Sequence, residues 1–179
     1  FAAGAVRMVR EATKLLSNPP AIYGHNAGIG TRTRAIWREV IDLLARLDGI
    51  DFRQTAPLKE GMPFLRPYGD EWRTSEATLS KPIPGINPTM IVRAGGLDQG
   101  NIGINLADVE ARGIEENILF LAGSAINSIK DASGKANPRM GAEAMLQAIC
   151  VRKRRDLHGA SPDEHVPALV ALADRKKLN

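Results

Sequence analysis

Small residues follow an apolar run within residues 117–128, NILFLAGSAINS. The run from Ile118 to Leu121 has no polar alternation, which predicts a strand buried on both faces, as in a parallel sheet flanked by helices. Gly123 and Ser124 come shortly after this run, and small residues let a ligand approach the backbone closely. The sequence therefore offers a binding site at the carboxyl end of this strand.

Two other predicted strands also end in residues that could do chemistry. His25 lies in the Gly-rich turn GHNAGIG, and Gly95 and Gly96 follow the apolar run MIVRA. The unperturbed pKa of histidine suits proton transfer near neutral pH. A histidine beside glycines also fits a hydrogen-bonded structural role, and glycines after strands also fit tight turns into helices. The residues alone leave both interpretations open.

Strands and helices are predicted to alternate along the chain. Strands are predicted near residues 21–25, 50–55, 90–94 and 117–122. Helices are predicted over residues 1–16, 31–49, 101–113, 137–156 and 161–177. Residues 58–88, rich in Pro, Gly and charge, are predicted to form one long functional loop or excursion. This pattern predicts an α/β fold with a parallel sheet, either open and doubly wound or part of a (β/α)8 barrel.

The predicted helix over residues 31–49 is strongly amphipathic. The side chains predicted to point inward are Ile36, Val40, Leu43, Leu44 and Leu47. The turn GHNAGIG before this helix superficially resembles a dinucleotide fingerprint. It lacks the proper spacing, and no acidic residue follows a second strand at the right place, so a dinucleotide site is not expected.

Composition and charge exclude several classes of protein. Of the 179 residues 44% are hydrophobic, enough for a core, but no run of about 18 apolar residues could span a membrane. The net charge of +4 collects in basic runs without interleaved aromatics, so nucleic acid is not an expected partner. The single cysteine, Cys150, is predicted to be buried and fits a reducing cytoplasm. No signal peptide is recognisable, and a chain that opens on Phe1 reads as a piece of a longer sequence.

Four stretches, in this order, resemble the C-terminal half of the large-chain barrel of RuBisCO and RuBisCO-like proteins. IYGHNAGIGTRT looks like the fifth barrel strand, and IDFRQTAPLKEG like the sixth strand with its mobile loop. VRAGG is similar to the seventh strand, and FLAGSAINS followed by SGKANPRMGAEAMLQAI to the eighth strand and the start of its helix. The resemblance covers nearly all of residues 1–179. It implies a parallel (β/α)8 TIM-type barrel domain, of which this chain carries roughly strands 5–8 and their helices, a half-barrel.

The resemblance also implies roles for particular residues. In barrels the loops after strands seven and eight commonly form a phosphate site. The residues expected to bind phosphate through their backbone amides are Gly95, Gly96, Gly123 and Ser124. His25, at the end of the fifth strand, is expected to transfer protons, and Lys59 matches a loop lysine that stabilises the developing carboxylate in the carboxylase. Without the resemblance, Lys59 would be taken for a solvated loop charge.

The sequence also departs from the family pattern. Asn26 stands where a phosphate-binding arginine is usual, and Phe52 or Arg53 replaces a catalytic histidine. Ala94 takes the place of a serine before the two glycines. The family's magnesium ligands would lie on an earlier strand, outside this chain, so Mg²⁺ is expected only in the full-length protein. Ordinary CO2 fixation on ribulose bisphosphate is therefore not expected.

The resemblance thus implies a segment of a RuBisCO-like enzyme, a lyase or isomerase, that acts on a phosphorylated sugar or sugar acid. Enolisation, isomerisation and decarboxylation share an enediolate intermediate. A half-barrel leaves two unpaired strand edges, so a homo-oligomer (dimer) or the missing N-terminal half is the expected partner. Two alternatives remain open: a catalytically silent RuBisCO-like scaffold, favoured by the missing histidine on the sixth strand, and a partner-dependent half-barrel.

Overall fold

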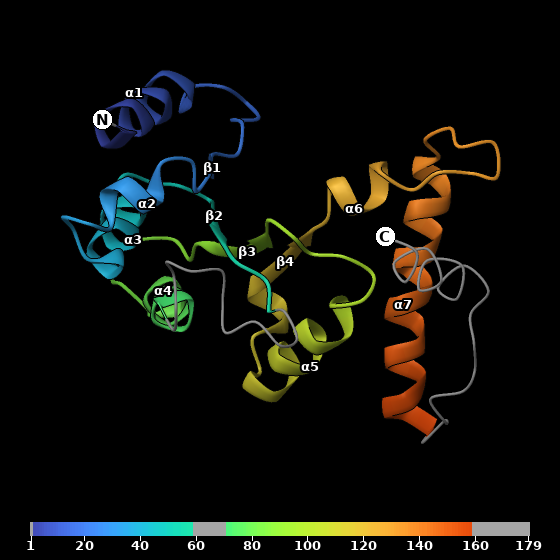
Figure 1. Cartoon of the computed structure of the whole chain (residues 1–179). Helices are drawn as coiled ribbons and strands as arrows, with labels where there is room; N and C mark the ends of the chain where they lie inside the picture. The colour runs from blue at the N-terminus through green and yellow to red at the C-terminus, as the bar shows by residue number, and fades with distance from the viewer. Residues whose placement is uncertain (1, 59–70, 159–179) are drawn as a thin grey trace. The chain divides into compact units, whose positions relative to one another are not determined.

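The computed structural model describes residues 2–58 and 71–158 (Figure 1). Its contacts divide the chain into two compact units, which are described one at a time. Unit 1 comprises Phe1–Ala56, Gly61–Ala94 and Ile114–Phe120, and unit 2 comprises Pro57–Glu60, Gly95–Gly113 and Leu121–Asn179. The predicted helix over 161–177 and Lys59 both lie outside the described residues.

A four-stranded sheet forms the centre of unit 1. Its strands are β1 (Tyr23–Gly24), β2 (Phe52–Thr55), β3 (Met90–Ala94) and β4 (Ile118–Leu121), and they lie side by side in chain order. The pairs β1–β2 and β2–β3 are parallel. The prediction of an α/β fold with a parallel sheet is therefore confirmed. The chain order without a reversal is typical of a barrel segment rather than of a doubly wound sheet with a switch point.

Seven α-helices are found among the described residues. They are α1 (Ala2–Thr13), α2 (Ile29–Arg32), α3 (Arg38–Leu47), α4 (Glu71–Ser80), α5 (Ile102–Arg112), α6 (Ser124–Asn127) and α7 (Pro138–His158). The helices predicted over 1–16, 101–113 and 137–156 correspond to α1, α5 and α7. Helix α4 lies within residues 58–88, which were predicted to form a loop or excursion, so that prediction was wrong for this part. The helix is possible because neither Pro nor Gly interrupts its sequence, EWRTSEATLS.

The helix predicted over residues 31–49 differs from the structure in two respects. It is split into α2 and α3, because Trp37 adopts an extended conformation with ψ of 142°. The prediction of its buried face was wrong. The side chains expected to point inward are 40% to 49% exposed, and these are Ile36, Val40, Leu43, Leu44 and Leu47. The face that is buried instead carries Arg38, Ile41, Asp42 and Arg46.

Two further predictions of burial are corrected by the structure. Ile118 is buried, but Leu119 and Leu121 on β4 are 45% and 55% exposed, so this strand is not buried on both faces. Side chains alternate along a strand, so Leu119 and Leu121 share one face of β4, and this face is only partly covered. Cys150, expected to be buried filler, is exposed on α7.

Helices α6 and α7 pack closely within unit 2. A Cβ atom added to Gly141, in the first turns of α7, would lie 2.2 Å from the carbonyl oxygen of Ile126. No side chain fits at this distance, and a backbone atom cannot move aside as a flexible side chain can. The glycine is therefore required by the approach of the two helices.

Gly141→Ala should destabilise the protein by about 1–3 kcal/mol, because the added methyl group overpacks this contact. Gly103→Ala in α5 is the matched control, since a Cβ there has no neighbour within 4 Å and alanine favours a helix. Free energies of unfolding from urea denaturation measure both effects. Equal stabilities of the two variants would contradict the packing argument.

Candidate functional site

The two faces of the sheet carry different kinds of side chain. In the register of the strands, Gly24 lies beside Arg53, and Thr55 lies beside Arg93. Arg53 binds Asp42 of α3, and Arg93 binds Glu76 of α4, so this face is covered by α3 and α4. Side chains alternate along a strand. The opposite face therefore carries Tyr23 and Phe52, together with Gln54, Val92 and Ala94.

His25 belongs to this second face. It follows β1 directly, two residues after Tyr23, and the centroids of the two rings lie 6.2 Å apart. Its side chain is exposed, at the carboxyl end of β1. The register also decides which residue of β2 shares its face, because Phe52 and Gln54 lie on the same side as His25 whereas Arg53 does not.

The hydrogen bond to His25 fixes the tautomer of its ring. The backbone N–H of Ala27 donates to Nδ1 of His25 at 2.9 Å. A neutral imidazole that accepts at Nδ1 carries its proton on Nε2. His25 therefore offers a donor, Nε2–H, from an exposed position at the end of β1.

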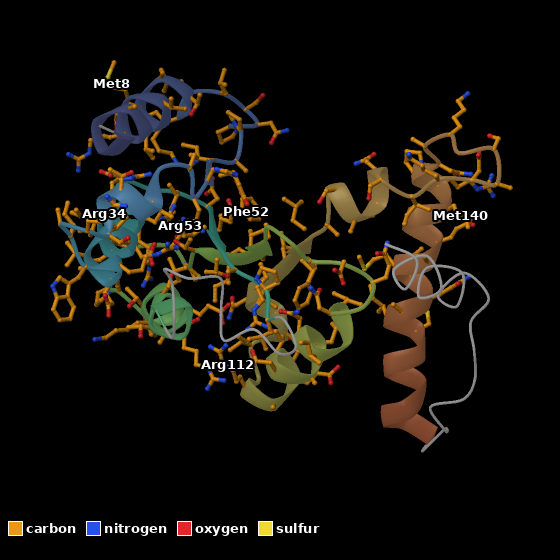
Figure 2. All side chains as sticks on the ribbon, viewed as in Figure 1. Met8, Arg34, Phe52, Arg53, Arg112 and Met140 are labelled. Carbon is orange, nitrogen blue, oxygen red and sulfur yellow. The ribbon has the colours of Figure 1, made fainter. Side chains whose placement is uncertain are left out.

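A buried ionic cluster lies on the other side of the sheet and includes Arg53, which is labelled in Figure 2. Asp42 is fully buried and accepts from Nε of Arg38 at 2.9 Å and from Nε of Arg53 at 2.8 Å. The hydroxyl of Ser75 on α4 also donates to Asp42. Burial lowers the pKa of Arg53, and the nearby carboxylate of Asp42 opposes part of this shift.

The two arginines of this cluster reach the turn that carries His25. Nη1 of Arg53 donates to the carbonyl oxygens of Gly24 at 3.2 Å and His25 at 3.3 Å. Nη2 of Arg38 donates to Oδ1 of Asn26 at 3.2 Å. Asn26 also donates its backbone N–H to Oε1 of Gln54, at 3.1 Å. Side chains of α3 and β2 thus hold three consecutive residues of the turn.

Unit 2 contains all four residues expected to bind phosphate. Gly95 and Gly96 have φ of 91° and 93°, a region that favours glycine, so the turn after β3 requires both. Gly123 has φ of −89° and precedes Ser124, the first residue of α6. A Cβ atom on Gly123 would have no neighbour within 4 Å among the described residues, so its backbone is open to approach on that side.

Gln99 connects these two turns. Its side-chain amide donates to the carbonyl oxygens of Ala125 at 3.1 Å and Gly141 at 3.2 Å. Gln99 itself is buried, and it lies in the loop that begins at Gly95 and Gly96. The loop after β3 is thereby tied to the first turns of both α6 and α7.

The residues that support these turns, Arg38, Asp42, Arg53 and Gln99, were not predicted from the sequence. A usable signal was present for the ionic cluster, because Asp42 interrupts the apolar run of a helix and Arg53 stands inside a predicted strand. Two opposite charges in buried elements are expected to pair. No comparable signal marks Gln99, since a polar loop residue after a Gly pair is ordinary.

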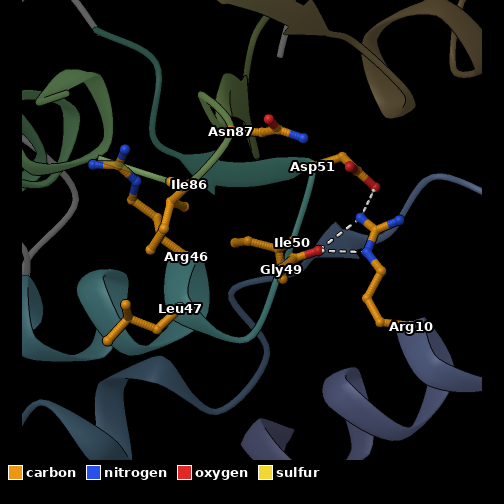
Figure 3. Close-up of a pocket in the computed structure, with 9 residues that line it drawn as sticks. Arg10, Arg46, Leu47, Gly49, Ile50, Asp51, Ile86 and Asn87 are labelled. Atoms are coloured by element: carbon orange, nitrogen blue, oxygen red, sulfur yellow. Dashed lines mark hydrogen bonds and ion pairs between the residues drawn. The ribbon is translucent and has the colours of Figure 1, made fainter. Parts of the chain in front are cut away.

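A pocket of about 370 Å³ lies at the other end of β2 (Figure 3). Its lining residues include Arg10, Arg46, Asp51 and Asn87. Arg10 donates through Nε and Nη2 to the carbonyl oxygen of Gly49, at 2.8 and 2.6 Å, and also pairs with Asp51. These bonds attach α1 to the start of β2, so this end of the sheet has a structural role.

The described residues contain no cluster of three His, Cys, Asp or Glu side chains that could hold a metal ion. None of the helices in the described part of the chain is long and apolar enough to cross a membrane.

Comparisons with known proteins identify the fold. No protein-family model matches the chain, and no curated protein does. Solved structures do match: the octameric ribulose-1,5-bisphosphate carboxylase/oxygenase (RuBisCO) of Pyrococcus horikoshii OT3 superimposes with a TM-score of 0.73 at 24% identity, over 98% of this chain. A RuBisCO-like protein of Burkholderia fungorum superimposes with a TM-score of 0.66 at 20% identity, over 96% of this chain.

These similarities show the fold. The resemblance to RuBisCO and RuBisCO-like proteins that the motifs predicted is confirmed at this level: the chain has the α/β fold of a segment of such a protein. The chain spans 39% and 40% of the length of these two proteins.

Gln99→Met should weaken the connection between the two turns, because the carbonyl oxygens of Ala125 and Gly141 lose a donor. The expected loss of stability is about 1–3 kcal/mol, with faster backbone hydrogen exchange in residues 95–101 and 123–127. Gln147→Met on α7 is the matched control, since the buried Oε1 of Gln147 has no hydrogen-bond partner in the part of the chain that the structure describes. A Gln99 variant as stable as this control would contradict the assignment.

Proposed function

We propose that this chain is the C-terminal part of the barrel of a RuBisCO-like enzyme, in which β1 to β4 are strands five to eight. The proposal is supported by the fold similarity over nearly the whole chain and by the parallel, chain-ordered sheet. In this assignment the carboxyl ends of the strands form the catalytic end of the barrel. His25, the paired glycines after β3 and the Gly123–Ser124 turn all follow carboxyl ends of strands.

The reaction we propose is enediolate chemistry on a phosphorylated sugar or sugar acid, as in enolisation, isomerisation or decarboxylation. The observation that carries it is the geometry of His25, which presents a donor on Nε2 because Nδ1 accepts from Ala27. A neutral imidazole that donates to a carbonyl oxygen stabilises the negative charge that develops there as the enediolate forms. His25 therefore acts as a hydrogen-bond donor to this oxygen, and the base that accepts the carbon-bound proton is proposed to come from another part of the full-length protein.

The proposed phosphate site uses backbone amides. Gly95, Gly96, Gly123 and Ser124 lie in one unit, and Gln99 connects their two turns. Oriented backbone N–H groups bind oxyanions without an arginine. With Asn26 in place of the family's arginine, a monophosphate is expected in preference to a bisphosphate. Lys59 is proposed as an electrostatic lid over the substrate.

Magnesium is not assigned to the described residues, which hold no suitable cluster of ligands. In the proposed assignment the magnesium ligands come from an earlier part of the protein, and none of the roles given to His25 or the glycines requires the metal ion. The proposed partner is a second copy of the chain, because the similar RuBisCO of Pyrococcus horikoshii is octameric and β4 exposes Leu119 and Leu121.

A catalytically silent scaffold is the second candidate. It is favoured by the side chains that share the face of His25 on β2, because neither Phe52 nor Gln54 is an acid or a base. Proton exchange separates the two candidates, since only an enzyme removes a carbon-bound proton of the sugar.

His25→Gln should slow enolisation by about 10²- to 10³-fold, the range typical of a lost hydrogen-bond donor to a developing oxyanion. The measurement is loss of the carbon-bound proton of ribulose 5-phosphate in D₂O, followed by proton NMR with the full-length protein. Tyr23→Phe, beside His25, is the control and should retain most activity. No exchange with any ketose phosphate by the parent protein would favour the silent scaffold.

Gly123→Val should weaken binding of sulfate by tenfold or more, because a bulky side chain blocks approach to the backbone; tenfold corresponds to about 1.4 kcal/mol. Sulfate is a suitable probe, since the Pyrococcus horikoshii structure is a complex with sulfate ion. The protein itself should tolerate the change, as φ is −89° and nothing lies within 4 Å. Gly103→Val is the control, and equal affinities in both variants would place the anion site elsewhere.

A further inference from the structure

The backbone ladder of the sheet ends before His25. Strand β1 has two residues, and its register with β2 covers only Tyr23 beside Phe52 and Gly24 beside Arg53. His25 and Asn26 therefore extend past the paired part of the strand. Residues at such a position depend on other contacts for a fixed conformation.

Those contacts come from the ionic cluster. Arg53 donates to the carbonyl oxygens of Gly24 and His25, and Arg38 donates to the side chain of Asn26. Arg38 also donates to the carbonyl oxygen of Gln54, at 3.2 Å, so it joins the turn to the end of β2. The two guanidinium groups replace the ladder that β1 lacks at this point.

Asp42 orients both arginines. Its Oδ2 accepts from Arg38 and its Oδ1 from Arg53, so one carboxylate fixes two guanidinium groups that would otherwise repel each other. Helix α3 supplies Asp42 and Arg38, and β2 supplies Arg53. The position of the turn is therefore set by how α3 packs on β2.

The cluster is a costly way to stabilise a fold. It buries two arginines against one carboxylate, and the buried Nη2 of Arg53 has no hydrogen-bond partner among the described residues. Buried ion pairs often contribute less to stability than well-packed apolar side chains of similar volume. Proteins depart from the most stable arrangement of side chains mainly near their functional sites.

We infer that Arg38 and Arg53, oriented by Asp42, are positioning residues that hold the Gly24–Asn26 turn and thereby keep Nδ1 of His25 on the N–H of Ala27. This holds the ring in the tautomer that carries its proton on Nε2. The inference rests on the proposed catalytic role of His25, but it makes a separate statement about the ring, which can be tested without a substrate.

The test compares Asp42→Asn with Glu76→Gln in the full-length protein. Both carboxylates are fully buried and paired with arginine, but Glu76 binds Arg93 and Thr55, on strands β3 and β2. The readouts are the ¹⁵N chemical shifts of the His25 ring nitrogens and the rate of proton exchange of ribulose 5-phosphate. Unfolding by urea measures the loss of stability in each variant.

We expect the parent and Glu76→Gln to show one tautomer, protonated on Nε2. Asp42→Asn should show a mixture of His25 tautomers and should catalyse proton exchange of ribulose 5-phosphate at least tenfold more slowly. Its loss of stability should be comparable to that of Glu76→Gln. Arg53→Lys keeps the charge but removes Nη1, which donates to the carbonyl oxygens of Gly24 and His25. The ¹⁵N chemical shifts of the His25 ring should therefore change in this variant as well. This variant decides the question if Asp42→Asn does not fold.

The inference would be overturned if the ¹⁵N chemical shifts of the His25 ring are unchanged in Asp42→Asn. If that variant does not fold, unchanged shifts in Arg53→Lys would overturn it. So would an equal change in Glu76→Gln, because the effect would then be a general loss of packing. The proposed function can fail separately. In that case His25→Gln leaves proton exchange of the sugar phosphate unaffected, while Asp42→Asn still changes the ¹⁵N chemical shifts of the His25 ring.

Discussion

Unit 1 depends on the hydrogen bonds and ion pairs of one buried group, the carboxylate of Asp42. It joins α3 to β2 through Arg53 and to α4 through Ser75. A buried charge must be paired, because an isolated carboxylate away from water costs several kcal/mol. The face of α3 that carries Asp42 is therefore forced toward the sheet. The register of β2 then determines that Arg53 lies on the same side as the helix.

This pairing explains why an amphipathic helix lies with much of its apolar surface exposed. Rotating α3 to bury Leu43 and Leu47 would expose Asp42 and leave Arg53 buried without a carboxylate. Hydrophobic burial contributes about 1.5–3 kcal/mol for each fully buried side chain, and losing one partner of a buried ion pair costs about 3–5 kcal/mol. Leu43 and Leu47 are already about half-buried, so only part of their burial energy is at stake, and the ion pair offsets this loss.

The two ends of the strands have different roles, as in other parallel α/β sheets. Strands end at a common edge, turns after them carry the residues that meet a ligand, and the opposite edge is used for anchoring. Here His25 follows β1, while Arg10 attaches α1 to Gly49 and Asp51 at the start of β2. In unit 2, Gln99 takes the corresponding supporting role for the glycine turns.

The sequence by itself determined the four strands, their parallel arrangement and the turns that carry His25, Gly95 and Gly123. These depend on local signals: apolar runs, helical periodicity and glycines. Only the tertiary structure decided which face of α3 is buried and which residue of β2 lies beside His25. Both depend on pairing between Asp42 and Arg53, residues eleven positions apart. Periodicity measures hydrophobicity along one helix, and it contains no information about a charge on a neighbouring strand.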